Sequence, residues 1–255
     1  MKYKIILIIV LNLFLSAREL QSLNLFNKEF YFFDGFENNL QIYTDNGKLI
    51  KEVDMSNINK NSISDFFIRY NSINSYLFDS ISGVLYFLDE NYNLSYSFDL
   101  TEIFKLKLNA EIYPANYNSL ILASEDLEKY YILENKEMSE IIFLSDDPVD
   151  YSYSSNSLFI LFSDKVEVYS YEGIYQRSFP LKELIEPSKI FISGKNLFVK
   201  HKDGIDRINC SINFKITGED YQTRIINESN IQDFAIVSNN AALLINNKII
   251  FRTLE

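Results

Sequence analysis

The stretch LQIYTDNGKLIKEVDM, from Leu40 to Met55, has the pattern of a strand, a tight turn and a second strand. Its centre contains Asn46-Gly47, a dipeptide that favours a type I′ hairpin turn because both residues tolerate a positive φ. Alternation of side chains resumes after the turn, from Leu49 to Met55. A single hairpin of this kind occurs in many β folds, so its repetition along the chain is what decides the fold.

The hairpin recurs as VLYFLDENYNLSYSFDL at residues 84–100 and as VEVYSYEGIYQRSFPL at residues 166–181. The three copies end alike, in Val53-Asp54-Met55, Phe98-Asp99-Leu100 and Phe179-Pro180-Leu181. Weaker copies lie at residues 130–144 and 205–216, and the final KIIFRTL at 248–254 matches only the first strand of the pair. The hairpin is therefore one part of a repeat.

Two more strand-like runs precede each hairpin, and the resulting units begin near residues 20, 65, 111, 149, 189 and 232. A spacing of roughly forty residues with four short strands per unit is typical of β-propeller blades. We predict a six-bladed β-propeller of four-stranded antiparallel blades, in which the sixth unit lacks its fourth strand. Residues 20–26 could supply that strand, but the first unit would then be one strand short. A large β-sandwich or two small β domains are the alternatives.

The composition agrees with an all-β fold. Of the 255 residues, 47% are hydrophobic and 15% aromatic, which is enough for a sizeable core. Tyr and Phe are abundant and favour strands, while only seven glycines are present. We therefore expect Asn, Asp and Ser to form many of the turns.

The hairpins at residues 40–55 and 84–100 resemble the third and fourth strands of blades in six-bladed β-propellers of the NHL and related bacterial secreted type. In such blades an apolar strand ends at Asp-x-x-Gly or Asp-x-Asn before the outer strand. The resemblance extends over most of the chain as a pattern and is specific at three hairpins. It implies a fold and no particular activity, because such propellers include binders, scaffolds and enzymes.

The N-terminus has the three parts of a secretory signal peptide. Lys2 and Lys4 form a positive region, residues 5–15 are apolar apart from Asn12, and a cleavage site follows Ala17. We predict a signal peptide at 1–17, a single propeller domain at 18–255, and a secreted or periplasmic location. Since Leu15 fits the cleavage pattern imperfectly, an uncleaved N-terminal anchor is the alternative.

The chain has a formal net charge of −11, and removal of residues 1–17 would make it more negative. Such a surface repels nucleic acid and anionic membranes. We therefore expect a protein or small-molecule partner, no nucleic acid, and no stable membrane insertion beyond the signal segment.

Motifs for catalysis are absent from the sequence. There is no G-x-S-x-G, P-loop or G-x-G-x-x-G, and a single His and a single Cys exclude an ordinary zinc site. His201 is expected to be an exposed residue at a strand end, and Cys210 a buried one. We predict no cofactor, although some six-bladed hydrolases that resemble lactonases hold calcium in the central channel, so calcium is an alternative.

A ligand site is expected on the innermost strands, which line the channel of a propeller. The candidate binding residues are polar or aromatic positions of these strands: Arg69, Tyr70, Glu111, Asp150, Tyr151, Lys189 and Asp233. The favoured function is an exported, non-enzymatic β-propeller binding or scaffold protein. A calcium-dependent, lactonase-like hydrolase and a structural subunit of an envelope assembly are the alternatives.

Overall fold

The structure is a computed structural model of the 255-residue chain. It describes residues 21–35, 37–58, 63–68, 75–79, 82–104, 110–116, 119–124, 129–134, 137–141, 148–154, 157–170, 173–182, 186–210 and 221–254. The predicted signal peptide and the candidates Arg69 and Tyr70 lie outside the described residues.

Each sheet is a meander of consecutive antiparallel strands. The first two sheets contain β1 (Gln21–Phe26), β2 (Glu29–Asp34), β3 (Asn39–Tyr43) and β4 (Leu49–Asp54), then β5 (Ile63–Ile68), β6 (Ser75–Asp79), β7 (Val84–Leu88) and β8 (Leu94–Asp99). A short helix, α2 (Leu100–Phe104), leads to β9 (Ala110–Asn116), β10 (Ser119–Ser124), β11 (Lys129–Glu134) and β12 (Glu137–Ile141).

The second half of the chain continues the same way. Its sheets contain β13 (Asp150–Ser154), β14 (Ser157–Leu161), β15 (Lys165–Ser170) and β16 (Tyr175–Pro180), then β17 (Lys189–Ser193), β18 (Asn196–His201), β19 (Gly204–Asn209) and β20 (Gln222–Ile226). The last sheet contains β21 (Ile231–Val237), β22 (Asn240–Ile245) and β23 (Lys248–Thr253).

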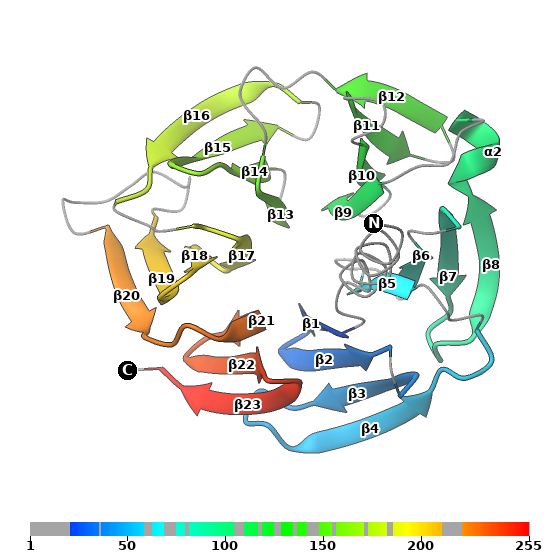
Figure 1. The fold of residues 1–255 in the computed structure, drawn as a ribbon, viewed down its shortest axis with the longest axis horizontal. Coiled ribbons are helices and arrows are strands. Elements are labelled where there is room, and N and C mark those ends of the chain that lie inside the picture. Colours follow the sequence, from blue (N-terminus) through cyan, green and yellow to red (C-terminus); the bar gives the residue numbers. More distant parts are fainter. Residues whose placement is uncertain are drawn as a thin grey trace, which may run out of the picture.

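The sheets are arranged radially around a centre, with the first strand of each sheet innermost and the last at the rim (Figure 1). The β-propeller prediction is confirmed, and the alternatives of a sandwich or two β domains are wrong. The described residues form five complete four-stranded blades rather than six, because the sheet β21–β23 has three strands. No strand from the first blade completes it, since β1 pairs with β2 in its own sheet.

Three of the outer hairpins share one turn, which differs from the predicted type I′. In the first blade, Gly47 N–H donates to Thr44 O at 3.0 Å and Thr44 N–H to Lys48 O at 2.9 Å. Of the turn residues 45–47, only Gly47 has a positive φ, 82°. This is a type I turn followed by a left-handed residue, a common hairpin connection. The turns at Tyr92 and Gly173 have the same hydrogen bonds and a positive φ at the same place.

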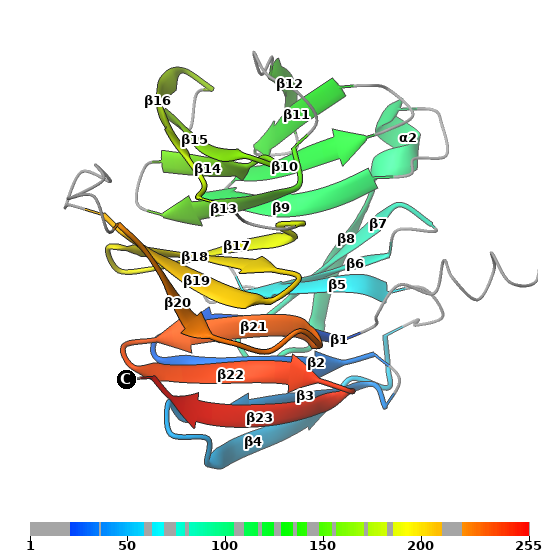
Figure 2. The same ribbon diagram turned by 60° about the vertical axis from the view of Figure 1, so that its left-hand side comes forward.

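The core lies between neighbouring sheets rather than in one central layer. The second strands whose burial is described are β2, β6, β14, β18 and β22, and they are almost wholly buried, as expected for strands with a sheet on each side. Phe30, Phe78, Phe159 and Leu243 have no exposed surface. Separate apolar clusters join the first sheet to the second, the fourth to the fifth and the fifth to the sixth. Neighbouring sheets face each other around the ring, as Figure 2 shows, so each apolar cluster lies between two blades.

The ring closes by side-chain packing between the last sheet and the first. Leu23, Phe30 and Phe32 of the first blade share a cluster with side chains of β21 and β22. Phe251 of β23 lies 5.1 Å from Tyr43 and 5.8 Å from Phe30 between ring centroids. Among the described residues, this seam therefore depends on apolar packing and a few hydrogen bonds, without an exchanged strand.

No helix in the described part of the chain is both long and apolar enough to span a membrane.

Candidate functional site

The innermost strands place several predicted candidates at equivalent positions. Asp150 of β13, Lys189 of β17 and Asp233 of β21 each lie opposite the same position of the second strand in their blades. Glu111 has this position in β9, although its side chain is outside the described set. The topology thus brings charged residues from several blades to the centre of the ring (Figure 1).

Asp233 connects three blades. Its Oδ1 is ion-paired with Lys189 Nζ and accepts a hydrogen bond from its neighbour Phe234 N–H at 2.7 Å. Its Oδ2 accepts a hydrogen bond from Leu23 N–H of the first blade at 2.8 Å. Both oxygens of this carboxylate therefore have hydrogen-bond donors. Two of the predicted candidates therefore contact each other, and one also fastens the seam of the ring.

Asp150 makes the corresponding contact one blade earlier. Its Oδ2 accepts a hydrogen bond from Ile190 N–H of the next blade at 2.7 Å. Burial among the inner strands raises the pKa of Asp150 to about 7; nearby Lys189 and the bond from Ile190 oppose the rise, and Asp233 adds to it. Asp150 and Asp233 are thus repeated links, each joining its own blade to the next.

Tyr151 has a different environment. It is only 6% exposed, so its ring packs inside the protein and offers little surface to a ligand in the channel. This agrees with the general use of aromatic side chains to fill the space between sheets.

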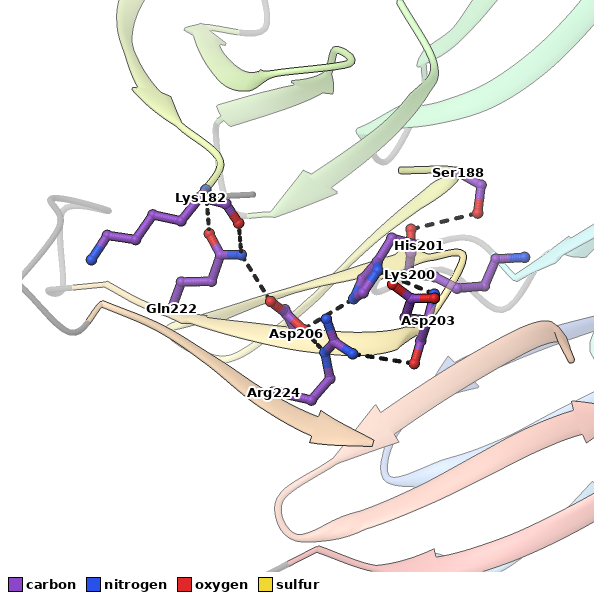
Figure 3. A network of polar contacts seen from close by, with 8 residues as sticks. All are labelled: Lys182, Ser188, Lys200, His201, Asp203, Asp206, Gln222 and Arg224. Atoms are coloured by element: carbon purple, nitrogen blue, oxygen red, sulfur yellow. Dashed lines mark hydrogen bonds and ion pairs between the residues drawn. The ribbon is translucent and has the colours of Figure 1, made fainter. Parts of the chain in front are cut away.

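The fifth blade contains a buried polar network that the sequence did not predict (Figure 3). His201, at the end of β18, is 4% exposed, so the prediction of an exposed residue is wrong. Its Nδ1 accepts a hydrogen bond from Asp203 N–H at 3.3 Å, and its Nε2 lies 3.0 Å from Asp206 Oδ1. Since Nδ1 accepts a hydrogen bond, the ring proton is on Nε2, and the Nε2–H group donates a hydrogen bond to Asp206.

Asp206 is the centre of this network. Arg224 Nε is ion-paired with Oδ1, and Gln222 Nε2 donates to Oδ2 at 2.8 Å. Burial alone would raise the pKa of Asp206, but the donors from Gln222, Arg224 and His201 outweigh it and hold the pKa below its usual value. Gln222 also exchanges two hydrogen bonds with the backbone of Lys182, so the network connects the fourth blade to the fifth.

Cys210 is buried, as predicted, at 9% exposure. Burial raises the pKa of its thiol to about 11, and the nearby Arg177 lowers it only in part. A thiol that remains protonated at neutral pH is a weak nucleophile.

Exposed apolar side chains recur at one position of the outer strands in three blades. Leu49, Leu94 and Tyr175 are 45%, 46% and 46% exposed. Each is the first fourth-strand residue paired after the turn, and in each blade a register shift separates this pair from the rest of the ladder. Exposed neighbours accompany them: Ile50, Tyr96 and Ile174. We call these six residues the apolar rim. Sequence reasoning missed it because an apolar residue in a strand is normally assigned to the core.

Within the described residues, no group of three His, Cys, Asp or Glu side chains is arranged to hold a metal ion.

No family model and no curated protein sequence match the chain. Solved structures match it at low identity. Virginiamycin B lyase from Staphylococcus aureus has a TM-score of 0.57 at 11% identity, over 93% of this chain and 86% of the lyase chain. The β-propeller domain of Cps50 (Swd1) from Myceliophteria thermophila has a TM-score of 0.59 at 9% identity, over 93% and 84%. BBS1N, solved in complex with ARL6DN, has a TM-score of 0.51 at 13% identity, over 89% and 75%.

These similarities show that the chain has the β-propeller fold. The matched structures with this fold include a lyase and proteins of other kinds, so the activity has to be argued from the residues of this chain.

Proposed function

We propose that this protein is a non-enzymatic β-propeller that binds a protein partner through the apolar rim. The observation that carries the proposal is the equivalent exposure of Leu49, Leu94 and Tyr175 in three blades. Exposed apolar side chains that recur at one position of several blades support an interaction surface, because burying them against a partner is favourable. The fifth blade has the polar Gln222 at the corresponding position, where it bonds to Lys182 instead.

Contacts between the first two blades support a continuous surface there. Lys51 of β4 lies 5.3 Å from the ring centroid of Tyr92, in the turn before β8. The outer strand that carries Leu49 and Ile50 is therefore next to the hairpin that carries Leu94 and Tyr96. Aromatic and aliphatic side chains beside a cationic one are typical of the centre and margin of a protein interface.

The inner-strand candidates support a structural role more than a ligand site. Lys189 and Asp233 neutralise each other, and Asp150 and Asp233 accept backbone hydrogen bonds from the next blade. Propellers of similar fold include one solved with a protein bound, BBS1N with ARL6DN, which is consistent with a protein partner here.

Export by the segment at residues 1–17 is part of the proposal, with the acidic remainder acting outside the cytoplasm. Mass spectrometry of the protein recovered from a bacterial host tests it. Cleavage after Ala17 with release to the periplasm or medium is the expected result. A full-length protein retained in the cytoplasm would contradict export and leave the rim proposal to its own test.

Paired variants in the second and fourth blades test the rim. The variant Leu94→Lys/Tyr175→Lys places charge on the rim, and Ser97→Lys/Ser178→Lys places the same charge on exposed positions of the same two strands. Both should keep the melting temperature of the wild type within a few degrees, because these side chains are exposed. Affinity capture from an extract of the source organism should recover a stoichiometric partner with the wild type and the serine-site variant only. Equal recovery by all three proteins would overturn the rim as the binding surface.

A further inference from the structure

Within the described residues, no fourth strand covers one apolar position of the three-stranded sheet, although the equivalent positions of other blades have a fourth-strand partner. Leu40, Leu85, Val166 and Ile205 occupy equivalent sites in the third strands, and none has exposed surface. Each lies opposite an apolar residue of the fourth strand, respectively Val53, Phe98, Phe179 and Ile226. Ile249 occupies this site in β23 and is partly exposed. The missing element is therefore an apolar side chain on an adjacent strand.

The backbone of β23 is oriented to receive such a strand. Leu254 N–H donates to Asn239 O at 2.6 Å, in line with the register of β22 and β23. Because hydrogen-bonded pairs alternate in an antiparallel ladder, Ile250 and Arg252 bond toward β22, and the backbone groups of Ile249, Phe251 and Thr253 point away from it.

The same edge is used by the fourth strand in the other blades. Met55 N–H donates to Asn38 O at 2.8 Å, Leu100 N–H to Gly83 O at 2.9 Å, and Leu181 N–H to Asp164 O at 2.8 Å. These donors are the last residues of the three endings Val53-Asp54-Met55, Phe98-Asp99-Leu100 and Phe179-Pro180-Leu181. In these three blades the fourth strand therefore ends in an apolar residue, any residue, and a second apolar residue.

The charge of Lys248 favours an acidic residue at the middle position of this pattern. In the first two blades the middle residue is an aspartate, which pairs with Asn39 or Val84 of the third strand. The corresponding third-strand residue in the last sheet is Lys248, which is exposed. An acidic residue opposite Lys248 would form a cross-strand pair of opposite charge, which is favourable in a sheet.

We propose that the edge of β23 binds an extended segment of a partner protein as a fourth, antiparallel strand, with the sequence pattern apolar–acidic–apolar. The edge has no proline, and its pairing with β22 shows no register shift, so two of the common means of blocking an edge strand are missing from β23. Backbone hydrogen bonds would supply affinity, and the site beside Ile249 would supply specificity, as in other cases of strand addition. This inference rests on the proposed binding role but uses a surface separate from the apolar rim.

A labelled peptide copying residues 92–100, YNLSYSFDL, is the probe, and fluorescence anisotropy with the full chain is the measurement. A peptide with Phe98→Ser and Leu100→Ser is the control and should bind at least about tenfold more weakly, because two apolar side chains lose their burial. In the protein, Ile249→Ala and Thr253→Pro should each weaken binding of the native peptide. Ile250→Ala shortens a side chain on the face of β23 opposite to Ile249 and keeps the backbone, so it should leave binding unchanged.

Other occupants give different results. Equal binding of the two peptides, or no binding of either, would overturn the proposal. A dimer in analytical ultracentrifugation that dissociates on Thr253→Pro would show that a second copy occupies the edge and would likewise overturn it. Binding that appears only after deletion of residues 2–17 would show that the chain's own N-terminal segment is the occupant, and it would also overturn the proposal. The rim variant Leu94→Lys/Tyr175→Lys should bind the peptide normally, so failure of one proposal is distinguishable from failure of the other.

Discussion

At the scale of single residues, Gly47 has two separate reasons to be glycine. Its φ of 82° lies in the left-handed region, where a side chain is unfavourable. A Cβ at this position would also lie 2.6 Å from Cγ of Phe251, in the last strand of the chain. The turn of the hairpin at Leu40–Met55 is therefore also a contact that closes the ring.

Gly47→Ala is expected to destabilise the protein more than Gly194→Ala. Both glycines have a positive φ, but a Cβ at Gly194 would meet no atom within 4 Å. The backbone term costs about 1 kcal/mol in each case, and overpacking against Phe251 adds about 1–3 kcal/mol for Gly47 alone. Urea unfolding measures both. Adding Phe251→Ala should reduce the effect of Gly47→Ala, and equal costs for the two glycine variants would contradict the contact.

At the scale of elements, the polar network shows how one blade holds its outer strand. Asp206 of β19 binds His201 of β18 and both Gln222 and Arg224 of β20, so it connects three adjacent strands. Three donors compensate the cost of burying this carboxylate. The sequence contained all of these residues, but His201 lies between two lysines, and only the packing of the fifth blade shows that its ring points inward.

Asp206→Ala is expected to destabilise the protein by about 2–4 kcal/mol, since it leaves the buried His201 N–H without an acceptor. The exposed ion pair of Lys202 and Glu186 provides the control, and Glu186→Gln should cost less than about 1 kcal/mol.

The carboxylate of Asp206 also leads to a prediction for the stability of the protein at low pH. Because the pKa of Asp206 is lowered in the folded protein, its stabilising effect is present above the unfolded pKa and is lost as the pH falls toward the folded one. The wild type should therefore lose stability below about pH 4 more steeply than Asp206→Asn. Parallel curves in urea unfolding at pH 2–5 would contradict this.

At the scale of the whole molecule, the ring is held by links that pass from blade to blade. Asp150 bonds to the fifth blade and Asp233 to the first, while apolar clusters fill the space between sheets. The seam between the last and first sheets joins residues about two hundred positions apart in sequence, as in the bond from Leu23 to Asp233. The ring is therefore complete only when the two ends of the described chain meet.

The stability of Asp150→Asn relative to the wild type is expected to increase as the pH rises. Since burial raises the folded pKa of Asp150 to about 7, its contribution is fully present below the unfolded pKa of about 4 and is lost as the pH rises through 7. Asparagine keeps an oxygen for Ile190 N–H and removes the charge. In urea unfolding at pH 5–8, the stability of the variant relative to the wild type should increase up to about pH 7 and level off above it. A difference independent of pH would show that Asp150 does not titrate in this range.

The sequence by itself determined the strand pattern of each blade. Alternation, turn residues and the repeated endings at Met55, Leu100 and Leu181 are local, and local propensity suffices to predict four-stranded units and an incomplete last one. Only the tertiary structure decided which side chains meet: the burial of His201, the contact of Gly47 with Phe251, the pairing of Lys189 with Asp233, and the exposure of the apolar rim. These depend on distances between residues far apart in sequence, and periodicity carries no information about which neighbouring sheet, if any, covers a given face.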